Sequence, residues 1–223
     1  MGYDYLDCVE INPPGKPQAA VIWLHGLGAD GHDFEPIATE LGLPADRAVR
    51  FVFPHAPHRA VTINFGMKMR AWYDILDMEV GRRVDTANIG QSAQQLKKLI
   101  QREADNGMPS KRIVVAGFSQ GGVISLHTAL RYPDRLAGIL ALSTYLPTAD
   151  SLEEEATDAN RDIPIMMAHG KYDPIIPIHN GISARNTLSG LGYPVEWHEY
   201  PMQHEVCLDE INAVRTWLLK VLG

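Results

Sequence analysis

The chain has 223 residues, of which 45% are hydrophobic, and this is enough apolar material for a large domain with its own buried core. Its 20 basic and 27 acidic side chains give a net charge of −7, and the basic residues form no cluster. This composition argues against binding to nucleic acid and against docking on anionic membranes. Two cysteines are too few for a disulfide framework, so we expect free thiols.

The N-terminal stretch MGYDYLDCVE carries three acidic residues and no apolar core, so we do not expect a signal peptide. A Met-Gly start is also found in myristoylation signals, but Leu6 stands where such a signal has Ser or Thr. No apolar run is long enough to span a bilayer. We therefore expect a cytoplasmic protein without stable membrane insertion.

Short apolar runs alternate with amphipathic segments along the chain. Several runs are apolar on both faces, as in strands that helices cover above and below. The predicted strands cover residues 19–24, 49–54, 112–118, 136–143, 163–170 and 195–200. The predicted helices include residues 86–107 and 206–222, where apolar residues recur at helical spacing. This alternation predicts a mostly parallel, three-layer α/β sheet, and no linker or repeat divides residues 1–223 into two domains.

The stretch VVAGFSQGGVISLHTAL, residues 114–130, places a serine between two glycines where a strand should turn into a helix. A serine at such a turn has a strained backbone, and only small residues fit two positions before and after it, as Gly117 and Gly121 do. The turn raises the hydroxyl above the sheet edge and directs the helix N-terminus at the reacting centre. We therefore predict that Ser119 is a nucleophile; the alternative is an ordinary serine in a tight turn.

A serine nucleophile needs a base, and in this architecture an acid and then a histidine follow it along the chain. Both should come directly after the carboxyl end of a strand. Asp173 follows the strand IPIMMAHG and His204 follows VEWHEY, so both meet this condition. The remaining candidates precede strands, lie in the acidic segment 149–162, come after every histidine, or fall inside a predicted strand or helix: Asp134, Asp162, Asp150, Asp158, Asp209, His198 and His179. The predicted triad is Ser119, Asp173 and His204, in which Asp173 fixes the tautomer and His204 takes and returns the proton.

An acyl-transfer site also needs N–H donors for the oxyanion. The N–H of Gln120, directly after the nucleophile, is the first candidate. The second should come from VIWLHGLGADGHDF, residues 21–34, where an apolar strand ends in a glycine-containing turn. The alternative for this segment is an ordinary glycine-rich turn. A phosphate-binding loop is excluded, because no glycine-rich fingerprint with lysine is present.

Six segments between residue 19 and the C-terminus resemble the phospholipase/carboxylesterase family, which comprises small bacterial carboxylesterases and acyl-protein thioesterases. They are VIWLHGLGADGHDF, AVTINFGMKMRAWYD, AGFSQGG, LALSTYLP, DPIIP and YPMQHEV. The resemblance implies an α/β-hydrolase fold with little or no cap domain, and hydrolysis of carboxylic esters or thioesters without a cofactor. It also implies a homodimer, because family members often form dimers that partly cover their active sites.

Carried over residue by residue, the family's nucleophile falls on Ser119, its acid on Asp173 and its base on His204. Its oxyanion donors fall on the backbone N–H groups of Leu27 and Gln120. This assignment agrees with the elimination made from strand ends.

The acyl pocket is predicted from apolar residues near these motifs. We expect Leu27, Met69, Trp72 and Ile176 to form its wall, since methionine in particular adapts to varied apolar ligands. The alternative is that these residues belong to ordinary core or loop packing. Whether residues 62–73 move as a lid is left open.

Two further features could be taken for a metal site and for a second nucleophile. His55 and His58 have a spacing that suits a metal, but no cysteine or carboxylate partner accompanies them, so we predict a loop between strands and no metal. Cys207 follows the predicted base and lacks a nucleophile turn, so we expect a free thiol near the site.

The sequence thus predicts a serine hydrolase that cleaves short- to medium-chain carboxylic esters, with thioesters such as S-acylated proteins as a second substrate class. The same triad serves both kinds of ester, so the choice between them and the physiological substrate stay open. The alternatives are a non-catalytic binding protein on the same scaffold and a peptidase.

Overall fold

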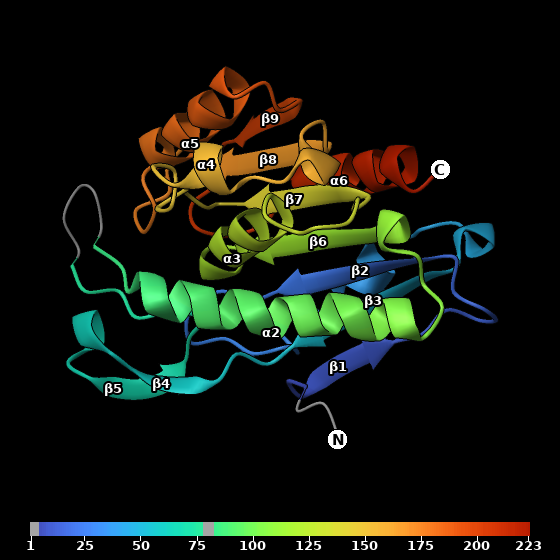
Figure 1. The fold of residues 1–223 in the computed structure, drawn as a ribbon, viewed down its shortest axis with the longest axis horizontal. Coiled ribbons are helices and arrows are strands. Elements are labelled where there is room, and N and C mark those ends of the chain that lie inside the picture. Colours follow the sequence, from blue (N-terminus) through green and yellow to red (C-terminus); the bar gives the residue numbers. More distant parts are fainter. Residues whose placement is uncertain (1–4, 78–82) are drawn as a thin grey trace.

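The computed structural model describes residues 5–77 and 83–223. The N-terminal residues 1–4, on which part of the signal-peptide and myristoylation predictions rest, lie outside this range. Within it, the centre is a seven-stranded sheet with the order β1-β3-β2-β6-β7-β8-β9 (Figure 1). The strands are β1 (Cys8–Ile11), β2 (Ala19–Leu24), β3 (Val49–Pro54), β6 (Ile113–Phe118), β7 (Gly138–Leu142), β8 (Ile165–Gly170) and β9 (Val195–Tyr200).

Every neighbouring pair in this sheet is parallel except β1 and β3, which are antiparallel. All six predicted strands are present, to within one or two residues at their ends. The strand β1 was not predicted, because its four residues are half-buried except for the exposed Glu10 and form no apolar run. The mostly parallel α/β sheet expected from the sequence is therefore confirmed.

Helices cover both faces of the sheet, as expected for strands that are apolar on both sides. The longer helices are α2 (Thr86–Asp105), α3 (Gln120–Ala129), α5 (Ile178–Gly190) and α6 (Leu208–Val221). The short ones are α1 (Ile37–Glu40), α4 (Leu152–Glu155) and four 3₁₀ turns, η1 (Ala45–Arg47), η2 (Thr62–Asn64), η3 (Ser110–Arg112) and η4 (Asp158–Asn160). In β2, Ile22 packs with the cluster that contains α2, α3 and α5, whereas Val21 packs with the cluster that contains α1 and α6. The two clusters together make a three-layer core.

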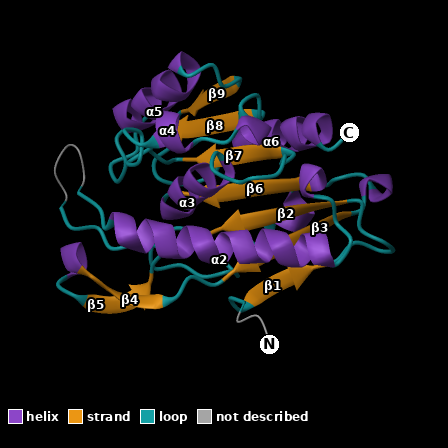
Figure 2. Cartoon of the chain, in the orientation of Figure 1, coloured by secondary structure: helices purple, strands orange, loops and turns teal. Residues whose placement is uncertain are grey.

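A second, two-stranded sheet lies beside the first (Figure 2). It is an antiparallel hairpin of β4 (His58–Val61) and β5 (Met67–Arg70), joined through η2. This hairpin contains most of residues 62–73, the segment whose movement as a lid the sequence left open. It also changes one prediction, because His58 begins a strand rather than lying in a loop.

The parallel strands place the predicted catalytic segments at one edge of the sheet. The arrows of β2, β6 and β8 point to the same side in Figure 1. The loops that leave their carboxyl ends begin at His25, Ser119 and Lys171, and the loop after β9 carries His204. Ligand sites of open α/β sheets form at this edge. No helix in the described residues combines the length and the apolarity needed to cross a membrane.

The helix α6 follows the loop that carries His204, and its first turn contains a fully buried glutamate, Glu210. Neither carboxylate oxygen of Glu210 makes a well-formed hydrogen bond within the described residues. Burial raises the pKa of Glu210 from 4.5 to about 8, and the nearby Cys207 N–H opposes this only in part. The folded protein therefore holds a proton that the unfolded chain releases between these two pH values.

We predict that the contribution of Glu210 to the free energy of unfolding decreases as the pH rises from about 4.5 to about 8, by up to about 1.4 kcal/mol per pH unit. This contribution is obtained as the difference between wild type and Glu210→Gln at each pH. Glu210→Gln should remove this slope, so that the variant exceeds the wild type in stability at the upper end and equals it at the lower end. Urea unfolding at a series of pH values measures it. Glu153→Gln, at an exposed position of α4, is the control. Identical pH slopes for wild type and Glu210→Gln would show that the group does not titrate in this window.

Candidate active site

Ser119 occupies the turn between β6 and α3 with φ 55° and ψ −119°, a conformation that is strained for a residue with a side chain. The flanking glycines are required by close packing. A Cβ atom at Gly117 would lie 2.2 Å from the carbonyl carbon of Gly121, and one at Gly121 would lie 2.2 Å from the carbonyl oxygen of Leu24. A hydrogen bond to β7 also holds the turn, because the Ser119 N–H donates to the carbonyl of Leu142 (2.9 Å).

Asp173 and His204 are joined by a short hydrogen bond. His204 Nδ1 donates to Asp173 Oδ2 at 2.7 Å, and Asp173 Oδ1 accepts the N–H groups of Ile175 and Ile176, both at 2.8 Å. Burial opposes ionisation, but the His204 and Ile176 hydrogen bonds outweigh it, so the pKa of Asp173 lies below its ordinary value. An ionised Asp173 keeps the proton of neutral His204 on Nδ1 and leaves Nε2 as an acceptor.

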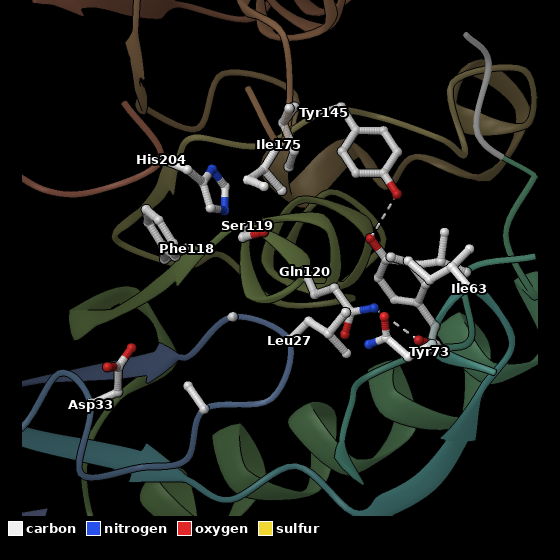
Figure 3. Close-up of a pocket in the computed structure, with 15 residues that line it drawn as sticks. Leu27, Asp33, Ile63, Tyr73, Phe118, Ser119, Gln120, Tyr145, Ile175 and His204 are labelled. Atoms are coloured by element: carbon white, nitrogen blue, oxygen red, sulfur yellow. Dashed lines mark hydrogen bonds between the residues drawn. The ribbon is translucent and has the colours of Figure 1, made fainter. Parts of the chain in front are cut away.

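The rings of His204 and Phe118 pack with centroids 4.7 Å apart, and His204 and Ser119 line one cavity (Figure 3). Within the described residues, no hydrogen bond joins the side chains of His204 and Ser119. Such bonds are often long before substrate binds. The structure therefore brings the three predicted residues to one site.

A second histidine, which the sequence analysis did not select, supports Asp173. His169 is fully buried at the end of β8, where its Nε2 donates to the carbonyl of Ile176 (2.7 Å) and lies 3.5 Å from Asp173 Oδ2. Burial lowers the pKa of His169, so the ring is neutral. The one sequence signal that could have identified His169 is its position directly before Gly170, at the end of a predicted strand.

The N–H groups of Leu27 and Gln120, the predicted oxyanion donors, have no acceptor within the described residues, and both residues line the cavity. Buried His25 orients the first of them. Its Nε2 accepts the N–H of Ala56 (3.1 Å), and its Nδ1 donates to the carbonyl of Gly26 (2.7 Å). Burial lowers the pKa of His25 to about 4, which keeps the ring neutral. The Gly26 carbonyl and the Leu27 N–H belong to one planar peptide and point in opposite directions, so this bond turns the N–H away from His25.

Trp72 does not line the cavity, and our prediction of it as a pocket wall was wrong. It is fully buried, and its indole N–H donates to the carbonyl of His25 (2.9 Å). Its backbone N–H donates to Gln120 Oε1 (3.0 Å), and Gln120 Nε2 donates to the carbonyl of Tyr73 (2.9 Å). Trp72 therefore links the two segments that carry the predicted oxyanion donors.

Met69 also differs from the prediction, because it is not among the residues that line the cavity. Its sulfur accepts a hydrogen bond from Asn64 Nδ2 (3.3 Å), which holds it within the hairpin. Leu27 and Ile176 do line the cavity, in agreement with the prediction.

The cavity has a volume of about 430 Å³ and is mostly apolar. Besides Ser119 and Gln120, the residues that line it are Gly26, Leu27, Ala29, Asp33, Ile63, Asn64, Tyr73, Ile75, Phe118, Tyr145, Ile175, Ile176 and His204. Most of these lie inside the segments that carried the family resemblance. The sequence could not assign them to the wall, because the direction of a loop side chain does not follow from spacing.

The histidines that the sequence offered as a metal pair have other roles in the structure. His55 Nδ1 accepts the N–H of Gly31 (3.0 Å), and His58 stands at the exposed start of β4. The part of the chain that the structure describes contains no group of three or more metal-binding side chains. Both cysteines are free, and Cys207 directly precedes α6.

Comparison with known proteins identifies the family. The model of the phospholipase/carboxylesterase family matches residues 6–222. The chain belongs to this family. It is 40% identical over 214 residues to acyl-protein thioesterase 1 of Gibberella zeae, covering 92% of this chain and 91% of the relative.

Solved structures extend the comparison. Acyl-protein thioesterase 2 of Zea mays superposes with a TM-score of 0.86 at 28% identity, covering 98% of this chain and all of that one. The esterase PE8 superposes with a TM-score of 0.83 at 26% identity, with coverage of 98% and 100%. The predicted family and the α/β-hydrolase fold are therefore confirmed, and this phospholipase/carboxylesterase is a hydrolase of the carboxylesterase and thioesterase type.

We predict that Gly121→Ala destabilises the protein by about 1–3 kcal/mol or more, because its Cβ atom would meet the rigid backbone of Leu24. Gly90→Ala is the matched control, since no atom lies within 4 Å of a Cβ at that position of α2. It should stabilise the helix by about 0.5–1 kcal/mol. Urea denaturation measures both. Equal stability of Gly121→Ala and wild type would contradict the packing described for the turn.

Proposed function

We propose that this chain hydrolyses carboxylic esters and thioesters through an acyl-enzyme on Ser119. The observation that carries the proposal is the 2.7 Å bond between His204 and Asp173 beside the cavity that Ser119 also lines. Asp173 holds His204 in the tautomer whose Nε2 accepts the proton of the Ser119 hydroxyl. Ser119 Oγ then bonds to the acyl carbon, and the carbonyl oxygen becomes an oxyanion.

In this mechanism the N–H groups of Leu27 and Gln120 stabilise the oxyanion. Their lack of other acceptors in the described residues and the bracing by His25 and Trp72 support this role, since fixed donors need no reorganisation when charge develops. His204 returns the proton to the departing alkoxide or thiolate. Water then attacks the acyl-enzyme with His204 again as base, and Ser119 is released together with a carboxylic acid.

The proposed substrates are small acyl esters and S-acylated proteins. Relatives named acyl-protein thioesterase 1 match almost the whole chain in Gibberella zeae and Mycosarcoma maydis, which favours the S-acylated class. The mostly apolar cavity of about 430 Å³ suits an acyl group of short to medium length. The proposed reaction uses only protein groups and water. A cytoplasmic location and a homodimer stay predictions from the sequence.

We predict that Ser119→Ala lowers kcat on oxyesters and thioesters by on the order of 10⁴-fold or more, because no hydroxyl is left to accept the acyl group. Steady-state kinetics on matched oxyesters, thioesters and amides measures this. Ser125→Ala is the control, since Ser125 is a buried serine of α3 that does not line the cavity. Equal activity of wild type and Ser119→Ala would contradict the mechanism, and faster cleavage of the amide than of its matched ester would favour the peptidase alternative.

A further inference from the structure

Two tyrosine hydroxyls meet inside the cavity. Tyr73, which follows β5, and Tyr145, which follows β7, are both buried, and their hydroxyl oxygens lie 3.0 Å apart within hydrogen-bond distance. Both residues line the cavity (Figure 3). The surrounding wall is largely aliphatic and includes Ile63, Ile75 and Ile176. The hydroxyl pair is thus a local polar feature in an apolar wall.

The tyrosine pair and His204 lie on different sides of Ser119. In Figure 3, His204 and Phe118 lie on one side of Ser119, and Tyr73 and Tyr145 lie on the other. In the proposed mechanism His204 gives its proton to the leaving group, so the leaving group departs toward His204. The acyl chain must then extend in the opposite direction, toward the tyrosines.

Both tyrosines are held by the same framework that holds the nucleophile. The backbone carbonyl of Tyr73 accepts a hydrogen bond from Gln120 Nε2 (2.9 Å). Thr144, directly before Tyr145, donates through its hydroxyl to the carbonyl of Ser119 (2.7 Å). The distance between the hydroxyl pair and Ser119 is therefore set by short, buried contacts, and the pair can distinguish positions along an acyl chain.

The chemistry of the pair indicates a neutral oxygen function as its ligand. A phenol hydroxyl both donates and accepts, so the pair can bind a hydroxyl or a carbonyl oxygen. The described residues that line the cavity include no lysine or arginine, so none of them offers a counter-charge to a carboxylate at the same place. A site that offers hydrogen-bond partners favours the substrate that uses them over an analogue of the same size that cannot.

We propose that Tyr73 and Tyr145 form a polar subsite that selects acyl groups with a hydroxyl or oxo group along the chain. This inference rests on the proposed function, because it places the subsite relative to an acyl-enzyme on Ser119. It names the substrate class more narrowly, as hydroxyacyl or oxoacyl esters and thioesters.

The test uses pairs of p-nitrophenyl esters with equal numbers of heavy atoms, one ending in a methyl group and one in a hydroxyl, from butanoyl to decanoyl length. For wild type, the ratio of kcat/KM for the hydroxyl ester to that for the methyl ester should pass through a maximum at one length, on the order of fivefold or more above the other lengths, which is the size expected for one hydrogen bond. In the double variant Tyr73→Phe/Tyr145→Phe this maximum should disappear. Tyr193→Phe, at a buried tyrosine that does not line the cavity, should retain it.

Two results would overturn the inference: a ratio that is flat across chain length in the wild type, or a maximum that persists in the double variant. The proposed function would survive either result, provided that the methyl esters are cleaved by wild type and not by Ser119→Ala. Absence of cleavage of every ester by wild type would instead remove the proposed function together with this inference.

Discussion

The active-site edge depends on one close backbone contact, between the turn at Ser119 and the carboxyl end of β2. A Cβ atom at Gly121 would lie 2.2 Å from the carbonyl oxygen of Leu24, and one at Gly26 would lie 3.3 Å from the ring of Phe118. Two strands that are neighbours in the sheet therefore bring Ser119, the proposed nucleophile, and the Leu27 N–H to the same place. The strain at Ser119 persists because packing from β2 and β7 over-determines the turn.

Around this contact, neutral buried side chains hold the groups that we propose to react. His25 directs the Leu27 peptide, His169 supports the segment that contains Asp173, and Trp72 links the segments of His25 and Gln120. Each of these bonds is buried, where an unpaired polar group is costly, so the arrangement is rigid before substrate arrives. Such preorganisation is what makes fixed N–H donors effective toward an oxyanion.

The sequence predicted the features that follow from local pattern and chain order. Apolar runs identify the parallel strands, and strand ends then select Asp173 from the later aspartates and His204 from the histidines that follow it. Gly117 and Gly121 mark the turn in the sequence, because neighbouring backbone atoms leave no room for a Cβ atom at either position. These predictions depend on knowing which end of each strand is its carboxyl end, and the order of strands and loops in the sequence gives this directly.

The pocket wall was harder to predict because it depends on where loop side chains point. Trp72 is large and apolar, as a wall residue should be, but its indole N–H needs an acceptor and finds the carbonyl of His25 in the core. Its neighbour Tyr73 lines the cavity instead. One residue of displacement along a loop thus reverses the assignment, and no periodicity in the segment distinguishes the two. The hairpin of β4 and β5 was missed for a related reason, since most of its residues are exposed or half-buried and form no apolar run.

The most direct measurement is the site of covalent acylation. The protein is mixed with a thioester or with a fluorophosphonate, quenched in acid and digested, and the modified peptide is identified by mass spectrometry. Our account predicts one adduct, on Ser119, that is absent from Ser119→Ala and unaffected by Cys207→Ala. An adduct on Cys207 with Ser119 unmodified, or full acylation of Ser119→Ala, would contradict it.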